Sequence, residues 1–351
     1  MRLPIVLFSD QQSVSAVTKR QTNPRAKRAS AICAINCGPL MCDSIRRLVL
    51  PIWLFLSSSS WVFAQAIPPL ELLVLGSGGP GAAGRAASSY LIFVDGDARI
   101  LVDAGPGSFA RLGEAKASLS DTDIVLLTHL HIDHAGEIPG MFKARAVSGS
   151  GPIVFNVWGP TGSPRKGDDA YFPGTREFLH LLFGPKGACA YLIDFAAPIT
   201  LHGHDISVSL ENAAPRQILK QGGVVITAIA GHHGDAPSVI YRIDHAGRSV
   251  TFSGDIDAQG LPSLRSIAKS TDLLVFNSVV LDPPGSPAIL YTLHTPPNAI
   301  GQLAKEVGAR ALLLSHISPA VDESNRAVLE SIRKNYTGSV TFATDGIRAR
   351  P

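Results

Sequence analysis

The chain has 351 residues, of which 45% are hydrophobic and 17% charged, with 33 glycines and 25 prolines. Such a composition excludes a disordered chain and is typical of a loop-rich globular α/β protein. Because 8 of the 31 basic and 2 of the 28 acidic residues precede Ile67, the rest carries 23 basic against 26 acidic residues. It therefore lacks the overall basic excess of polynucleotide-binding proteins.

The N-terminal segment has the three parts of a secretory signal peptide. An Arg-Arg pair precedes the apolar run LVLPIWLFL, and the small-residue site Ala64-Gln65-Ala66 follows. The apolar run is too short, and too interrupted by proline and serines, for a stable membrane span. We predict that residues 41–66 are a signal peptide cleaved after Ala66, and that the mature protein is periplasmic or secreted. An uncleaved anchor is the alternative.

The start of the protein is open between Met1 and Met41. Met41 alone begins a signal peptide of ordinary length, and residues 1–40 are polar without hydrophobic periodicity. Residues 1–40 are therefore interpreted as a non-native or disordered N-terminal extension. A single domain is predicted over residues 67–351, because strands and helices alternate there in two similar halves without an evident linker.

The first predicted strand, 70–75, runs into the glycine-rich stretch GSGGPG. Such a loop can bind phosphate, but Pro80 and the small residues after it do not begin a periodic helix. A tight loop near the floor of the site is the better interpretation. A hairpin predicted from 90–94 and 99–102 ends at Asp103 beside glycines, where the carboxylate is expected to bond backbone or support a neighbouring ligand loop.

The apolar run 124–127 is predicted to be a buried strand, and four side chains able to bind metal follow it within six residues. His129 and His131 alternate along the chain and can point the same way. Asp133 and His134 follow a turn and can reach a second position nearby. One loop can therefore supply two metals, as in two-metal hydrolysis. A chance cluster of surface or core histidines is the alternative.

Residues 159–187 are rich in glycine, proline and charge, and are interpreted as a lid or substrate-selecting insertion. His180, on a helical patch there, is expected in core packing or on the lid surface. His202 and His204 precede a strand predicted at 206–210. They imitate the spacing of the earlier histidines, but no carboxylate–histidine pair follows, so both are expected in an edge loop.

In the second half, further predicted strands deliver acidic or histidine residues at their carboxyl ends. Nitrogen and oxygen ligands without thiolate suit zinc, with iron or manganese as alternatives. One helix is predicted over 321–335. The strands are 224–230 before His232 and His233, 249–252 before Asp255, and 311–314 before His316, while His294 precedes a helix at 297–307.

Six segments resemble the metallo-β-lactamase superfamily, and within it the ribonuclease Z and arylsulfatase-like branch. In chain order they are LGSGGPG, LVDAGPG, LTHLHIDHAGEIPG, HGDAPSVIYRI, FSGD and LLLSHISP. The resemblance runs from about residue 70 to the C-terminus. It implies an α/β fold, the four-layer αββα sandwich of that superfamily, and the activity of a metal-dependent hydrolase.

The resemblance implies two metals per chain, expected to be zinc, with Asp255 bridging them. A hydroxide shared by both metals would attack the substrate, and Asp133 would orient it or accept its proton. His294 matches a histidine that assists catalysis in the ribonuclease Z branch, by protonating the leaving oxygen or stabilising developing charge; a structural role is the alternative. The implied ligands are His129, His131 and His233 for one metal, and Asp133, His134 and His316 for the other. His233 is preferred to His232 because HG followed by P and YR matches the segment of the family.

Departures from the family narrow the expected substrate. The 22 positions from His233 to Asp255 leave no room for the tRNA-grasping arm of ribonuclease Z, and Asn277 stands where many relatives of the branch have glutamate. A small ester, sulfate ester or phosphodiester is the expected substrate, nucleic acid is not an expected partner, and a homodimer is left open. The alternatives are a ribonuclease Z-like endonuclease and a periplasmic metal-binding protein without turnover.

Overall fold

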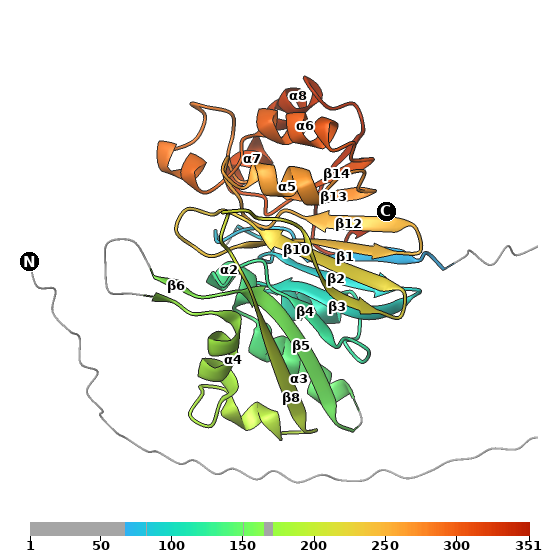
Figure 1. Ribbon diagram of the computed structural model, residues 1–351. Coiled ribbons are helices and arrows are strands. Elements are labelled where there is room, and N and C mark those ends of the chain that lie inside the picture. The colour runs from blue at the N-terminus through green and yellow to red at the C-terminus, as the bar shows by residue number, and fades with distance from the viewer. Residues whose placement is uncertain (1–66, 82, 150, 165–170) are drawn as a thin grey trace, which may run out of the picture. The chain divides into compact units, whose positions relative to one another are not determined.

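Two seven-stranded sheets, with helices on their outer faces, make up the fold (Figure 1). The computed structural model describes residues 67–81, 83–149, 151–164 and 171–351. The predicted extension, signal peptide and cleavage site lie outside the described residues. Within the described ranges, every helix falls short of the length and apolar character that crossing a membrane needs.

The first sheet has the strand order β16-β1-β2-β3-β4-β5-β8, antiparallel from β16 to β3 and parallel from β3 to β8. The parallel part places the carboxyl ends of its strands at one edge of the sheet. The bounds are Leu70–Gly76 for β1, Ser89–Val94 for β2, Asp97–Ala104 for β3, Ile124–Leu126 for β4, Ile153–Pro160 for β5, Ile199–Ile206 for β8 and Arg348–Ala349 for β16.

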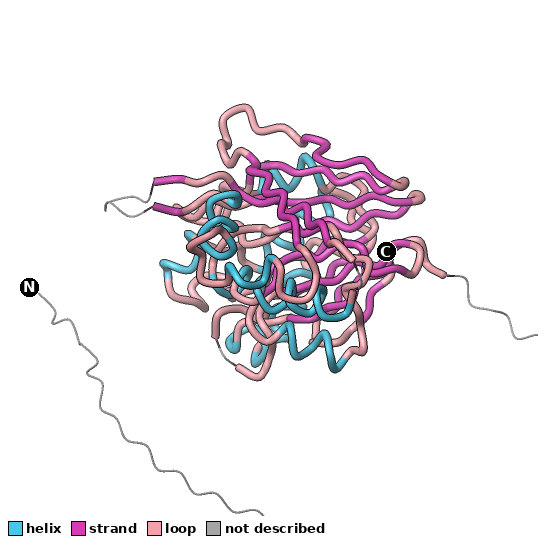
Figure 2. The backbone as a smooth tube through the Cα atoms, turned by 90° about the horizontal axis from the view of Figure 1, so that it is seen from below, coloured by secondary structure: helices cyan, strands magenta, loops and turns pink. Residues whose placement is uncertain are grey.

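The second sheet has the order β15-β14-β13-β12-β11-β10-β9, parallel from β15 to β12 and antiparallel from β12 to β9. A short separate pair, β6 (Ser163–Pro164) and β7 (Tyr171–Phe172), extends outward from the sheets (Figure 2). The bounds are Arg216–Gln221 for β9, Val224–Ala230 for β10, Val239–His245 for β11, Arg248–Phe252 for β12, Leu273–Asn277 for β13, Ala311–Ser315 for β14 and Ser339–Phe342 for β15.

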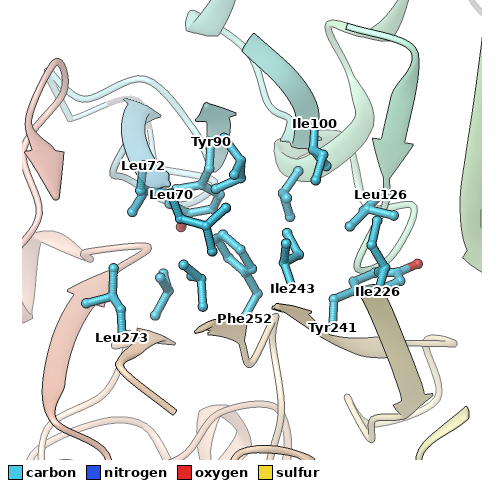
Figure 3. Close-up of a cluster of buried hydrophobic side chains, with 14 of the residues drawn as sticks. Leu70, Leu72, Tyr90, Ile100, Leu126, Ile226, Tyr241, Ile243, Phe252 and Leu273 are labelled. Atoms are coloured by element: carbon cyan, nitrogen blue, oxygen red, sulfur yellow. The ribbon is translucent and has the colours of Figure 1, made fainter. Parts of the chain in front are cut away.

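The main core lies between the two sheets. Alternate residues of each strand point into it, so Leu72 and Tyr90 of the first sheet face Phe252 of the second (Figure 3). The residues between them point the other way, as Leu73 does, and pack under the helices. Burial on both faces explains why the strands have unbroken apolar runs instead of a polar alternation.

Helices cover the outer face of each sheet (Figure 1). Phe142 of α3 and Leu179 of α4 pack on the first sheet, and Leu264 of α5, Leu303 of α6 and Val328 of α8 pack on the second. This order of layers confirms the expected αββα sandwich. The bounds are Ser108–Glu114 for α1, Ile132–Ala135 for α2, Ile138–Ser148 for α3, Thr175–Phe183 for α4, Leu261–Ile267 for α5, Pro297–Glu306 for α6, Pro319–Glu323 for α7 and Asn325–Arg333 for α8, with 3-10 helices η1 at Ala190–Ile193 and η2 at Ala288–Thr292.

The prediction of one helix over 321–335 is wrong, because the segment forms α7 and α8. Ser324 lies between them at φ −115° and ψ 21°, outside the helical range, and its amide bonds to the Val321 carbonyl. Serine is less favourable inside a helix than at its ends, so it suits the position between the two helices.

The placement of His202 and His204 in a loop is also wrong. Both lie within β8, which covers 199–206 instead of the predicted 206–210. Glycine is common in loops, and Gly203 between the two histidines favours that interpretation. In the structure, the absence of a side chain at Gly203 instead allows helix α4 to approach the strand. A Cβ at Gly203 would lie 3.1 Å from the Leu179 side chain of α4.

Candidate metal centre

The histidine-rich loop leaves β4 and enters α2 within a few residues. His131 is the N-cap of α2, with an extended backbone at φ −63° and ψ 152°. His129 therefore precedes the helix, whereas Asp133 and His134 lie in its first turn. The change from strand to helix turns the two pairs of side chains toward different positions, as the sequence predicts.

Three other strand ends bring their side chains to the same place. His233 follows β10, Asp255 follows β12 and His316 follows β14. All three residues are buried, as are His129 and His134, and His131 is partly exposed. His294, which follows η2, is 7% exposed and joins the same cluster.

One oxygen of Asp255 lies at the centre of this cluster. Five imidazole nitrogens surround its Oδ2 atom, from four separate parts of the chain. The distances to Oδ2 are 3.4 Å for His316 Nε2, 3.7 Å for His134 Nε2, 3.7 Å for His233 Nε2, 3.9 Å for His129 Nε2 and 3.9 Å for His294 Nδ1.

The side chains in and around Asp255 form four groups of three in the described residues, each with ligand atoms within 4.8 Å of one another; two contain Asp255 itself, with His129 and His134 or with His233 and His294, and two do not. The Nε2 atoms of His129 and His134 are buried and have no hydrogen-bond partner among the described residues. A buried, unpaired imidazole nitrogen costs free energy, so these residues fit divalent cations that accept nitrogen and oxygen donors. The two groups without Asp255 are His129, His131 and His233, and Asp133, His134 and His316.

Hydrogen bonds fix the orientation of several of these side chains. Asp103 accepts from the Thr128 amide at 2.7 Å and pairs with His134 Nδ1 at 2.8 Å, which confirms the prediction that it supports the ligand loop. His233 Nδ1 lies 2.8 Å from the Leu293 carbonyl oxygen. Such contacts to the far nitrogen fix the tautomer and leave Nε2 free to bind a metal.

Asn277 contacts the other oxygen of Asp255. Its Nδ2 donates to Asp255 Oδ1 at 2.6 Å, which leaves Oδ2 to face the histidines. The Asn277 amide therefore presents a neutral hydrogen-bond donor to the carboxylate. An acidic side chain at this position would instead repel the Asp255 carboxylate at short range.

Electrostatics favour an ionised Asp255 carboxylate and neutral imidazoles at His129 and His294. Burial alone would lower the pKa of His134, but the Asp103 and Asp255 carboxylates beside it raise that pKa well above its usual range. Burial alone would raise the pKa of Asp255, but His316 and His134 beside it bring that pKa well below its usual range. Burial lowers the pKa of His129 well below its usual range and that of His294 to about 4. Neutral imidazoles present the lone pairs that metal binding requires.

The structure separates His232 from the cluster. Its Nδ1 pairs with Asp257 Oδ2 at 2.8 Å. Sequence reasoning did not identify Asp257 as a partner of this histidine.

The predicted substrate-selecting insertion reaches the cluster through β7, where the Phe172 ring centroid lies 6.3 Å from that of His131. Nothing in the sequence pattern distinguishes Phe172 from the other apolar residues of the insertion.

Replacing His233 by alanine is expected to weaken metal binding by more than the roughly 10- to 100-fold that loss of an orienting partner costs. The matched change is His232→Ala, one residue earlier and outside the cluster. It should leave metal content unchanged. Metal analysis of both purified variants checks the assignment, and an equal loss of metal in both would contradict it.

The sequence matches the metallo-beta-lactamase superfamily over residues 82–274, more than half of the chain. The chain belongs to this superfamily; it is a metallo-beta-lactamase fold hydrolase, and the fold implies binding of divalent metal. Its relatives include ribonuclease Z of Mycobacterium sp. (strain KMS), 26% identical over 270 residues that cover 74% of this chain and 87% of that protein. Ribonuclease Z of Myxococcus xanthus (strain DK1622) is 28% identical over 272 residues, covering 70% and 86%.

Solved structures show the same fold. Human tRNase Z, short form, superimposes with a TM-score of 0.60 at 20% identity, covering 80% of this chain and 99% of that one. The metallo-beta-lactamase fold protein YhfI from Bacillus subtilis gives a TM-score of 0.59 at 21% identity, with the same coverage. The expected membership of the superfamily and the resemblance to ribonuclease Z are confirmed.

Proposed function

We propose that the protein is a dinuclear zinc hydrolase that cleaves a small ester, sulfate ester or phosphodiester. The observation that carries the proposal is the position of Asp255 Oδ2, within 3.4 to 3.9 Å of histidines from both groups. His129, His131 and His233 would hold one ion, and Asp133, His134 and His316 the other. A single shared oxygen between two such groups is suited to a pair of adjacent cations.

When bound, two divalent ions supply an activated water and polarise the substrate oxygen. The side chains then have distinct tasks. Asp133 has its Oδ2 atom 3.1 Å from His316 Nε2 and is 7% exposed, so its carboxylate can orient the attacking water or accept its proton. His294 Nδ1 lies 3.9 Å from Asp255 Oδ2, so the ring is close enough to the cluster to donate a proton or a hydrogen bond to the leaving oxygen.

Several features favour a small substrate over RNA. The chain from Ile67 on has a net negative charge. The segment between His233 and Asp255 is filled by β11 and β12, a hairpin without additional elements. Phe172 of β7 supplies an apolar contact beside His131. An apolar contact next to the metals suits the organic part of a small ester.

The proposal is tested by metal analysis of the purified protein together with a panel of aryl sulfate, phosphodiester, lactone and β-lactam substrates. We expect two zinc ions per chain and turnover of one small-substrate class. Activity should disappear on chelation and return with zinc. Fewer than two metals at full occupancy, or activity that survives complete removal of metal, would contradict the proposal.

A ribonuclease Z-like endonuclease is the second candidate, because the relatives with 26% and 28% identity carry that name. It predicts cleavage of a tRNA precursor that weakens steeply with salt, since contacts to phosphates release counterions. Turnover of the small phosphodiester at high salt, without cleavage of the precursor at low salt, would decide for the first candidate.

We further propose that the protein is exported. The proposal rests on the basic, apolar and small-residue segments before Ile67. Expression of the full chain in a bacterium with an outer membrane should give a periplasmic protein whose N-terminal residue, by Edman sequencing, is Ile67. A cytoplasmic protein with an intact N-terminus would contradict export.

A further inference from the structure

The carboxylate of Asp345 accepts hydrogen bonds from parts of the chain that are far apart in the sequence. It lies in the turn that leads from β15 of the second sheet to β16 of the first. Its Oδ1 accepts from the Ser77 amide at 3.0 Å and the Ser77 hydroxyl at 2.7 Å. Its Oδ2 accepts from the Ala86 amide at 2.8 Å and from Arg111 Nε at 3.0 Å.

These donors lie at the two ends of the glycine-rich loop, defined here as the described residues 77–81 and 83–86. Ser77 is at its start and Ala86 at its end, so one carboxylate closes the base of the loop. Arg85 adds to the closure, because its Nη1 donates to the Ser77 hydroxyl and to the Ala343 carbonyl, each at 2.8 Å. The loop is therefore attached to the C-terminal segment at both ends.

The glycine-rich loop lies directly against His316. The Ile317 amide donates to the Ser77 carbonyl at 2.8 Å, and Gly78 forms a parallel bridge with Ile317. Gly79 packs so closely that a Cβ added there would overlap the His316 imidazole. His316 itself has φ +54°, a left-handed conformation that a residue other than glycine adopts only when its surroundings hold it.

His316 differs from the neighbouring histidines in how its ring is held. Asp103 pairs with Nδ1 of His134, and the Leu293 carbonyl with Nδ1 of His233. The Nδ1 atom of His316 is buried and has no hydrogen-bond partner among the described residues. A metal-binding histidine ordinarily needs such a partner for its orientation. The Nε2 atom of His316 contacts Asp133 and its ring stacks on that of His134, so packing against the glycine-rich loop supplies the support on the remaining side of the ring.

We propose that Asp345 is a positioning residue for His316: by closing the glycine-rich loop, it sets the metal affinity of the position formed by Asp133, His134 and His316. The inference rests on the proposed dinuclear function. The position formed by His129, His131 and His233 has its own support and should not depend on Asp345. Loss of the Asp345 charge should therefore affect one metal and spare the other.

Asp272 provides a matched control at the opposite end of the second sheet. Both carboxylates are 11% exposed, and both bond the amide and hydroxyl of one serine and an arginine. For Asp272 these are Ser249 at 2.9 and 3.0 Å and Arg310 at 2.8 Å. Asp272 lies at the amino end of β13, whereas the candidate ligands lie at the carboxyl ends of the strands. Loss of the Asp272 charge should therefore perturb the fold without disturbing the glycine-rich loop.

The experiment measures zinc affinity by chelator competition, and cobalt spectra of the two positions, in the wild type, Asp345→Asn and Asp272→Asn. His316→Ala and His131→Ala serve as references for loss of each position. We expect Asp345→Asn to weaken, by about 10- to 100-fold, only the position lost in His316→Ala. Asp272→Asn should lower Tm and leave both affinities unchanged.

Three results would each overturn the proposal. Asp345→Asn could leave both affinities unchanged, or it could weaken the position that is lost in His131→Ala. Alternatively, Asp272→Asn could show the same selective weakening as Asp345→Asn. If Asp345→Asn does not fold, Ser77→Ala removes one of the four hydrogen bonds and should weaken the same position by a smaller factor; no weakening would overturn the proposal. A wild type that binds fewer than two ions would refute the dinuclear function itself, and is thus a distinct result.

Discussion

Replacing Asp255 by asparagine is expected to lower kcat/KM by about 10³-fold or more, because at least about 4 kcal/mol of transition-state stabilisation depends on two correctly placed cations. Its Oδ2 atom is the one that five histidine nitrogens surround. Asparagine keeps the size of the side chain and removes the charge that, in the proposed dinuclear centre, would hold both ions. Metal analysis and steady-state kinetics of the purified variant check this, and both metal content and kcat should fall.

Asp257 offers a control two residues further on. It is 4% exposed, against 2% for Asp255, and it also pairs with a histidine, His232. It lies outside both groups of candidate ligands. Asp257→Asn should therefore retain both metals and most of the activity. A variant of Asp255 that behaved like this control would show that the shared oxygen does not hold the metals.

The cluster could be predicted from sequence because the candidate metal ligands lie within a few residues of the end of a buried strand. Strands β4 and β14 are buried on both faces, so their sequences, IVL and ALLLS, are apolar runs with a clear end. Strand β12, RSVTF, is less apolar, although four of its five residues are buried. A histidine or aspartate at that end must lie at the carboxyl edge of a parallel sheet. The sequence therefore defines the edge where the side chains meet, although not the distances between them.

Features that depend on tertiary contacts could not be predicted. The polar strand β9, RQILKQ, has no apolar run because it lies at a sheet edge. The strand character of His202 and His204 depends on the approach of α4 to Gly203. The contact between Asp345 and Ser77 joins residues 268 positions apart, and neither residue has a local pattern that points to the other.

Replacing His294 by alanine should lower kcat by about 10²- to 10⁴-fold, the range typical for loss of a positioned acid–base group. Its Nδ1 atom lies 3.9 Å from Asp255 Oδ2, and it shares a group with His233 and Asp255, yet the two groups proposed to hold metal, His129-His131-His233 and Asp133-His134-His316, are complete without it. The variant should therefore keep two metals and an unchanged KM. Steady-state kinetics combined with metal analysis separate this outcome from the loss of metal expected if His294 were a ligand.

His202→Ala is the suitable control, because His202 is exposed on β8 and lies outside both groups. It should match the wild type in rate and metal content. A protein whose histidines serve only to bind metal would lose nothing measurable when His294 is replaced. An unchanged kcat in His294→Ala would therefore show that His294 does not take part in the reaction. The rate enhancement would then depend on the metal ligands alone.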